Sequence, residues 1–361
     1  MTLGALVNAL LVNCAWKSYI TVIMRVISGL LISVFLAFYF SSLWSAEATA
    51  NNDSQAEAEK LLQQAEELTD IRSSGSRAFH LATLVKLFDD KGKAREGTYD
   101  LLWKSPTVWR DELKFADFSQ VRIAAADKLF VNRNPRSLSL EVFQLLKLLE
   151  FPNLLRISPE AKAQKLRERT RNGSRDRTIE LAFPGQSAWK IISLDGSSPI
   201  PTRVEYKGSH FGYQFENYVA FNGHQYPRTL VEFNSNKPLI QVQVQGLTEA
   251  ILDEASSFVP PPEARWLHWC PHPEHAKPVN VDWGKEHPIP EPLRGGALEH
   301  PVAIYGVIGT DGQWHNVAVV RSAGKEVDSY WINEMLQERF SPAKCGEVPV
   351  EQESVQEYYL R

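Results

Sequence analysis

The first feature of the chain is a long apolar segment near its start. Residues 26–44 are nineteen consecutive residues without a charge, preceded by Lys17 and Arg25 and followed by Glu47. A helix that spans a membrane needs about 20 apolar residues, and flanking basic residues stay on the cytoplasmic side. The pattern therefore predicts that the chain after Ala46 is exported.

Two interpretations of this segment stay open. Residues 1–48 are either a signal peptide cleaved near the small residues Ala46 and Ala48, or an uncleaved membrane anchor. The start codon is Met1 or Met24. The expected location is accordingly the inner membrane with the chain facing the periplasm, or the periplasm itself after cleavage.

Apolar residues then recur at helical spacing in three segments. Residues 55–68 follow a cluster of capping residues, residues 139–149 are apolar on more than one face, and residues 159–169 begin with a proline. Capping residues and an early proline both favour a helix start. We therefore expect three helices, the second of them mostly buried.

Between and after these helices the apolar period changes to two. Turn residues separate the apolar runs about every eight to twelve positions, which is typical of an antiparallel meander. Asn222-Gly223 is a strong hairpin signal, and residues 240–245 alternate strictly between apolar and polar. Residues 51–258 are therefore expected to form one α+β domain with a single antiparallel sheet. The predicted strands are 97–103, 108–113, 119–125, 128–132, 178–183, 188–194, 202–206, 213–221, 225–233 and 239–245.

The carboxy-terminal part, residues 293–361, repeats the alternation on a smaller scale. Asp311-Gly312 marks a tight turn, and Asp328 is expected to cap a helix. The predicted elements are strands at 302–308 and 314–320, a helix at 328–339 and a strand at 348–360. This order predicts a ββαβ unit, a small three-stranded sheet with one helix on a face.

Residues 259–292 are expected to link the two domains. Nine prolines punctuate this stretch and disfavour strand ladders. Cys270 lies inside it, and Cys345 lies in the carboxy-terminal part. In an exported chain this pair has two alternatives, a disulfide or two separate buried thiols.

Composition and charge exclude several function classes. With 361 residues, 43% of them hydrophobic, the chain is long enough for more than one core. It has 39 basic and 43 acidic residues, so its net charge of -4 does not favour nucleic acid. The basic run at residues 162–177 contains no interleaved aromatic residues and is expected to be a solvated helix face and loop.

Catalytic and metal-binding motifs are absent from the sequence. It contains no G-x-S-x-G, no phosphate loop, no H-E-x-x-H and no dinucleotide fingerprint. Asp111 and Glu112 fall on opposite faces of a strand, which is unsuitable for paired-carboxylate chemistry, and the other carboxylates are expected to be solvated. The histidines near Cys270 match no zinc spacing: His268, His272 and His275. We therefore expect no enzymatic activity, no cofactor and no metal.

A helix, antiparallel strands that carry residues 103–110, an inserted helix and the later hairpin at residues 219–227 follow one another in the middle region. In this order residues 51–258 resemble periplasmic lipoprotein carriers of the LolA type. The resemblance implies a curved, antiparallel half-barrel whose concave apolar surface holds an acyl chain. Burial tendencies alone place Trp103 and Trp109 in the core.

The carboxy-terminal part carries a set of residues in the order of its expected elements: Gly306, Asp311-Gly312, Val317 to Arg321, Ser322-Ala323-Gly324, Asp328, Arg339 to Ala343, Gly346 and Pro349-Val350. With this set, residues 293–361 closely resemble the carboxy-terminal domain of the TonB family of energy transducers. The resemblance implies a periplasmic domain that takes up an extended peptide from a protein partner, an outer-membrane receptor or a membrane complex. The chain departs from the family because it has no long Pro-Lys tract and no histidine in residues 26–44 for proton coupling.

These observations lead to two hypotheses. The first is a TonB-like protein that binds a partner by strand addition, in energy-dependent transmembrane transport, since the open edge of a three-stranded sheet recruits a strand. The alternative is a periplasmic lipid or lipoprotein carrier that uses the middle domain. The expected partner-binding residues are Ser354, Val355, Gln356, Glu357, Tyr358, Tyr359 and Leu360.

Overall fold

The structure is a computed structural model that describes residues 54–89, 91–156, 161–171, 174–183, 187, 189–251, 257–279 and 301–358. The chain divides into two compact units, residues 1–58 and residues 59–361, and the fold below is that of the second unit. The expected signal or anchor, residues 1–48, lies outside the described residues, as do Tyr359 and Leu360. Among the described residues, no helix has the length and apolar character that a membrane crossing needs.

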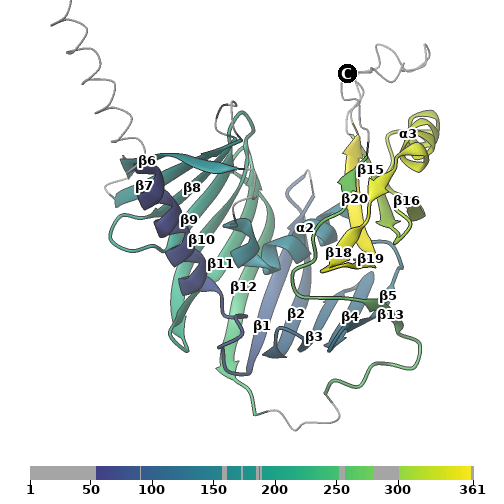
Figure 1. Cartoon of the computed structure of the whole chain (residues 1–361), viewed down its shortest axis with the longest axis horizontal. Helices are drawn as coiled ribbons and strands as arrows, with labels where there is room; N and C mark the ends of the chain where they lie inside the picture. The colour runs from purple at the N-terminus through teal and green to yellow at the C-terminus, as the bar shows by residue number, and fades with distance from the viewer. Residues whose placement is uncertain are drawn as a thin grey trace, which may run out of the picture. The chain divides into compact units, whose positions relative to one another are not determined.

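A thirteen-stranded antiparallel sheet forms the main body of this unit (Figure 1). Two meanders, β1 to β5 and β6 to β12, are joined side by side where β1 pairs with β12. The strands are β1 (Phe79–Phe88), β2 (Ala94–Ser105), β3 (Val108–Phe115), β4 (Phe118–Ala125), β5 (Lys128–Asn134), β6 (Lys162–Arg171), β7 (Ser174–Ala182), β8 (Lys190–Asp195), β9 (Pro201–Tyr206), β10 (Phe211–Phe221), β11 (His224–Asn234), β12 (Lys237–Glu249) and β13 (Arg265–His268). The large antiparallel sheet expected from the alternation is confirmed.

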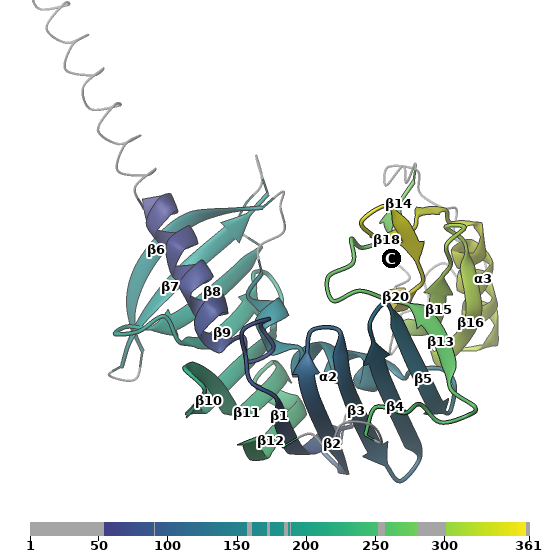
Figure 2. The ribbon, with the colours of Figure 1, turned by 60° about the horizontal axis from the view of Figure 1, so that its bottom comes forward.

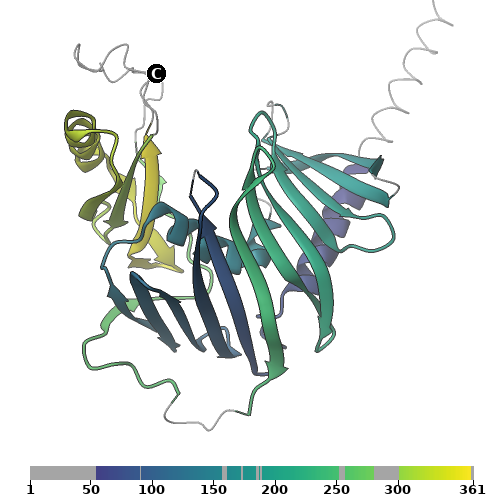
Figure 3. The same ribbon diagram turned by 180° about the vertical axis from the view of Figure 1, so that it is seen from behind.

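The alternation of side chains gives this sheet one buried face. In β1, Phe79, Leu81 and Val85 are buried, whereas Leu84 between them is 45% exposed. The hairpin expected at Asn222-Gly223 joins β10 to β11, and both residues have the positive φ that such a turn requires. The sheet curves, and the helices lie on its concave side (Figures 1 and 3).

Two helices and one 3-10 turn pack on this concave face. Residues 54–69 form the first helix, and its part within this unit, from Glu59 on, has Leu62 and Ala65 buried. The helix α2 (Leu140–Leu149) begins at Ser139, whose hydroxyl accepts a hydrogen bond from the Val142 amide at 3.3 Å. The turn η1 (Phe151–Leu154) follows directly. The first two expected helices are thus confirmed, and α2 is mostly buried as its apolar composition predicts.

The third expected helix, residues 159–169, is wrong. Residues 162–171 form β6, which pairs with β7 and ends the sheet, so the basic run 162–177 is a β-hairpin and not a helix face. Pairing with a neighbouring strand outweighs the helical propensity of a Lys-, Arg- and Glu-rich segment, and charged residues suit an edge strand because they discourage further pairing.

The proline-rich segment also contains strands, contrary to expectation. Residues 265–268 form β13, which pairs with β5 at the other edge of the sheet (Figure 2). Lys277–Pro278 form the short strand β14, which pairs with Phe340–Ser341, strand β17. The prolines flank β13 and do not enter it, so its backbone N–H groups remain available for the ladder.

The carboxy-terminal module, defined here as residues 301–358, has the predicted order of elements with different boundaries. A three-stranded sheet, in the order β16-β15-β20, is formed by β15 (Val302–Ile308), β16 (Trp314–Arg321) and β20 (Gln352–Tyr358). The other elements are α3 (Lys325–Gln337), β18 (Ala343–Cys345) and β19 (Val348–Val350). The expected single strand 348–360 is interrupted, because Val348–Val350 pairs with Ala343–Cys345 instead.

The start of α3 also differs from the prediction. The helix begins after Gly324, and Asp328 lies in its first turn, where its carboxylate accepts hydrogen bonds from the Ala323 amide at 2.9 Å and the Ser322 hydroxyl at 2.5 Å. Asp328 thus satisfies groups that precede the helix without occupying the cap position itself. The helix packs on the sheet through Val327 and Met335, both buried.

The central strand of this module is buried on both faces. All seven residues of β15 are buried, although α3 covers only one face. Gly306 allows the helix and hairpin to approach closely, since a Cβ atom there would lie 2.7 Å from the Trp314 ring. The opposite face, with Ala303 and Tyr305, is buried by the rest of the second unit, which makes the module an integral part of the fold.

Candidate functional site

The concave face of the large sheet has two chemically different halves. Residues that are cross-strand partners lie on the same face. The polar half is defined by residues of β2 to β5 that face inward: Tyr99, Asp111, Gln120, Arg122 and Arg133. The apolar half is defined by residues of β7 to β12, all buried: Ile179, Ile192, Val204, Phe215, Leu230 and Val242.

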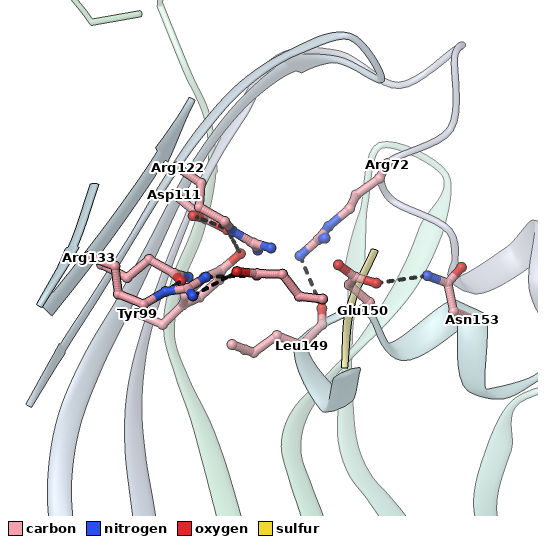
Figure 4. A network of polar contacts seen from close by, with 10 residues as sticks. Arg72, Tyr99, Asp111, Arg122, Arg133, Leu149, Glu150 and Asn153 are labelled. Carbon is pink, nitrogen blue, oxygen red and sulfur yellow. Dashed lines mark hydrogen bonds and ion pairs between the residues drawn. The ribbon is translucent and has the colours of Figure 1, made fainter. Parts of the chain in front are cut away.

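The polar half is centred on a buried ion pair. Arg122 donates to Asp111 through Nε at 3.1 Å and through Nη2 at 2.5 Å, and Tyr99 donates to Asp111 at 3.3 Å (Figure 4). Asp111 is 1% exposed. Burial alone would lower the pKa of Arg122, but the charge and hydrogen bonds of Asp111 raise it above its ordinary value. The pKa of Tyr99 is raised by burial and by the same carboxylate.

A second ion pair fastens the carboxy-terminal module to this half. Arg133 donates two parallel hydrogen bonds to Glu353 of β20, each at 2.9 Å, and Tyr305 of β15 donates to the same carboxylate at 2.7 Å. Burial raises the pKa of Glu353, but the hydrogen bonds and charge of Arg133 outweigh burial and hold it below its ordinary value. Arg133 also donates to Gln120 at 2.6 Å, whose amide nitrogen is buried without a partner.

The loop after the first helix and the end of α2 add further hydrogen bonds next to this half. Arg72 donates to the backbone carbonyl of Leu149 at the end of α2, at 3.0 Å, and Asn153 donates to Glu150 at 3.2 Å (Figure 4). Electrostatic attraction of Glu150 contributes to the raised pKa of both Arg72 and Arg122. The charges of the polar half are therefore matched by partners, which is the condition for burying them.

In the apolar half one carboxylate has no such partner. Glu232 of β11 lies in register with Tyr213 of β10 and Ile240 of β12. Its side chain is fully buried, and neither carboxylate oxygen has a hydrogen-bond partner among the described residues. Burial raises the pKa of Glu232 to about 8, with Lys147 of α2 acting in the opposite direction and Glu357 in the same direction.

Tyr213, the cross-strand neighbour of Glu232, belongs to a cluster of aromatic rings. The rings of Trp189, Tyr206, Phe211 and Tyr213 form a chain of contacts with centroid separations of 5.3–6.4 Å. Burial, and then the charge of Glu232, raise the pKa of both Tyr206 and Tyr213. The hydroxyls of these two tyrosines therefore stay protonated at neutral pH.

Two lysines lie near the margins of the apolar half. Lys190 is 5% exposed and donates to the Arg156 carbonyl at 3.4 Å, and burial lowers its pKa to about 8. Lys147 is exposed, and its ammonium rests over the Phe143 ring at 4.2 Å. Neither lysine forms an ion pair with Glu232 in the described part of the chain.

The expected partner-binding residues are distributed over a strand that is partly covered. Ser354 to Tyr358 all lie in β20, which is an edge strand of the three-stranded sheet. Ser354 and Val355 are buried, Gln356 and Glu357 are exposed, and the Tyr358 ring stacks on Trp331 at 4.6 Å.

The two cysteines and the histidines near them were the candidates for a disulfide and for a metal site. Cys270 and Cys345 form a disulfide, which ties the segment after β13 to the carboxy-terminal module. Among the described residues no group of histidine, cysteine and carboxylate side chains is arranged to hold a metal. His272 instead lies 3.0 Å from Arg156, and its pKa is lowered by burial and by that arginine.

Two carboxylates are buried contrary to expectation. The expectation that the carboxylates outside Asp111-Glu112 are solvated is wrong for Glu232, and the sequence indicates no structural role for Asp111. For Glu232 a signal existed, since in a strand with Leu230 on the inward face the position two residues later also faces inward. The partner of Asp111 could not be found in this way, because a cross-strand contact depends on register.

The chain was compared with known proteins. No protein-family model matches it, and no curated protein matches it significantly. It is structurally similar to a LolA-superfamily protein from Nitrosomonas europaea, with 13% identity over 54% of this chain and 94% of that chain at a TM-score of 0.36. It is also similar to an outer membrane lipoprotein-sorting protein domain from Vibrio parahaemolyticus, with 16% identity over 56% and 97% at a TM-score of 0.38.

A third solved structure with similarity is a DUF1329 family protein from Desulfovibrio piger, with 10% identity over 57% of this chain and 97% of that chain at a TM-score of 0.40. The names of two of these three structures mention the LolA superfamily or lipoprotein sorting. The comparisons give no support to the resemblance of residues 293–361 to the TonB family.

Proposed function

We propose that the protein is a non-enzymatic, periplasmic carrier that binds an acyl chain, of a lipid or a lipoprotein, in the apolar half of its concave face. The single observation that carries the proposal is the mismatch between this face and its cover. The six strands β7 to β12, at about 4.8 Å spacing, make a face about 24 Å wide, and its longer strands are about 36 Å long. Its cover consists of the first helix, about 24 Å long, of α2, about 15 Å long, and of the turn η1, and a helix is about 10 Å wide.

The first helix and α2 are both shorter than the longer strands that they cover. The sheet itself is curved (Figure 3), and the side chains that define its apolar half are buried. We infer that an apolar chain enters this face when the short helices move aside. Apolar surface with a few polar groups is the usual lining of a small-molecule site.

The contacts of the carboxy-terminal module support the location of the site. The module is held against the polar half by the Arg133–Glu353 pair and by the disulfide. No ion pair ties it to the apolar half in the described part of the chain. We therefore expect the acyl chain in the apolar half, to which the module is not tied by charge pairs. Burial of each CH₂ group of the chain there contributes about 0.8 kcal/mol.

A photoreactive fatty acid with a diazirine in its chain tests the proposal. After illumination of the full-length protein, we expect cross-linked peptides from β8 to β12 and from α2. The matched control is an excess of unlabelled fatty acid, which should remove these cross-links. Absence of cross-links, or cross-links confined to residues 301–358, would contradict the proposal.

A second function, strand addition to β20, is favoured by one observation. In the described part of the chain β20 has a single neighbouring strand, so its other edge has unpaired backbone groups, next to the exposed Gln356 and Glu357. This is the TonB-like hypothesis, in which a protein partner adds a strand. Amide hydrogen exchange tests it: a partner that adds a strand slows exchange in 352–358 and leaves β16 unchanged, and equal protection of both strands would contradict it.

A further inference from the structure

The apolar half contains one feature that an acyl chain alone does not explain. Glu232 is fully buried, and both of its oxygens lack a hydrogen-bond partner among the described residues. A buried polar group without a partner costs about 1–3 kcal/mol or more, and most folded proteins satisfy such groups. A leucine at this position would fill the same face without that cost, so the carboxyl group requires a reason outside the packing of the fold.

Groups from four elements lie near Glu232. Tyr213 from β10 and Tyr206 from β9 contribute rings, α2 contributes Lys147, and β20 contributes Glu357, which is itself paired with Arg321. Lys147 is exposed and its ammonium rests on Phe143, so it leaves the carboxyl group unpaired. The site therefore offers a carboxyl group near tyrosine rings, without a hydrogen-bond partner among the described residues.

The chemistry of these groups selects one kind of ligand head. A carboxylate or phosphate would find no cation paired with Glu232 to offset the cost of its own burial, and a carbonyl could pair only with a protonated oxygen of Glu232. A primary ammonium group has three N–H donors, enough for both oxygens, and its charge is attracted to the faces of tyrosine rings. A quaternary ammonium would gain the ring contact but would leave both oxygens without hydrogen bonds.

We propose that Glu232 binds the protonated primary amine at the head of an apolar ligand, with the rings of Tyr206 and Tyr213 beside it. This inference rests on the proposed carrier function and names the ligand class of the same site. Because Glu232 is fully buried, the amine reaches it when the short helix α2 and its neighbours move aside, as the entry of the acyl chain also requires. The ligand class is an alkyl amine or a lipid with an aminoethyl head.

Binding of an ammonium ion changes the protonation state of Glu232. At pH 7 the free protein holds Glu232 mostly neutral, because burial raises its pKa to about 8. A bound ammonium ion favours the carboxylate, so binding releases close to one proton from Glu232 to the buffer. A ligand with the same tail and a hydroxyl head releases none.

Calorimetry with three probes of equal chain length tests the inference on the full-length protein: hexadecylamine, hexadecanol and palmitate. We expect hexadecylamine to bind about 10- to 100-fold more tightly than hexadecanol, with a binding enthalpy that changes with the ionisation enthalpy of the buffer. Glu232→Gln should remove both the preference and the buffer dependence and leave hexadecanol binding unchanged. The matched control is Glu216→Gln, an exposed carboxylate on the neighbouring strand β10, which should change nothing.

The outcomes separate the two proposals. If none of the three probes binds, the carrier function fails. If all three bind with similar affinity and without proton release, the carrier function stands and the amine site is wrong. The comparison of the three heads on the unchanged protein decides the question even if the Glu232→Gln variant does not fold.

Discussion

The polar and the apolar half of the concave face treat buried charge in opposite ways. In the polar half, Asp111 meets Arg122, and Glu353 meets Arg133, each through at least two hydrogen bonds. In the apolar half, Glu232 is buried as deeply and meets no donor. Burial alone therefore does not identify a functional residue. What distinguishes Glu232 is that the fold provides partners for comparable groups a few strands away and provides none here.

The ion pairs also explain why the carboxy-terminal module packs against the polar half. Its inner face meets the polar half through Glu353, and Arg265 of β13 pairs with Glu351 just before β20. The disulfide joins the same two regions. Charge pairs with fixed geometry specify how two surfaces dock, whereas apolar contacts of the other half tolerate replacement of one partner by another.

The largest expected effect is the loss of the central ion pair. Asp111→Ala leaves Arg122 buried without its partner and should lower the free energy of unfolding by about 3–5 kcal/mol. Urea titration of the purified protein measures it. Asp117→Ala is the control, since Asp117 pairs with Arg95 on the surface and its side chain is 62% exposed, so its loss should change stability little. Equal effects of the two variants would remove the distinction between buried and surface pairs.

The disulfide should have the next largest effect. Replacing both cysteines, Cys270→Ala with Cys345→Ala, removes a cross-link that spans 75 residues and should cost about 2–4 kcal/mol, since the unfolded chain gains freedom. Faster hydrogen exchange in β15 and β20, with no change in β10 and β11, would locate the loss. Reductant should lower the stability of the original protein and leave the double variant unaffected.

The pH dependence of stability tests the difference between the two halves at Glu232. Its pKa is raised from 4.5 to about 8, so the folded state holds the proton more tightly and stability should fall as pH rises from about 4.5 to about 8. Glu232→Gln should remove this slope and make the protein more stable at pH 8 than the original, because the buried charge is no longer formed. A variant that is less stable at every pH would show that the carboxyl group serves packing.

Glu353 should give the smallest effect and the opposite pH dependence. Its pKa is lowered below 4.5, so its contribution is complete above about pH 4.5 and is lost as pH falls through the folded-state pKa. Glu353→Gln should cost about 1–2 kcal/mol at pH 7, because Arg133 keeps a hydrogen-bond partner but loses the charge. The difference from the original should disappear in acid, and persistence of the full difference at pH 3 would contradict the assignment.

Much of the fold could be predicted from local pattern. The alternation in residues 240–245, the Asn222-Gly223 turn and the apolar helix after Ser139 each depend on residues close in sequence, and each is present in the structure. The helix predicted at 159–169 failed because the signal was local while the outcome was set by β7. β13 was hidden among prolines for the same reason, since its partner is β5.

Local patterns in the sequence predict a large antiparallel sheet with one buried face, a mostly buried central helix and a smaller ββαβ module after a proline-rich segment. Those features follow from side-chain periods of two and 3.6, which any reader of the sequence can count. The tertiary structure alone decided which charges meet. Asp111 with Arg122, Arg133 with Glu353 and the isolation of Glu232 depend on strand register and on contacts up to 220 residues apart. Such distances carry no signal in one sequence, because any of the many charges could have been the partner.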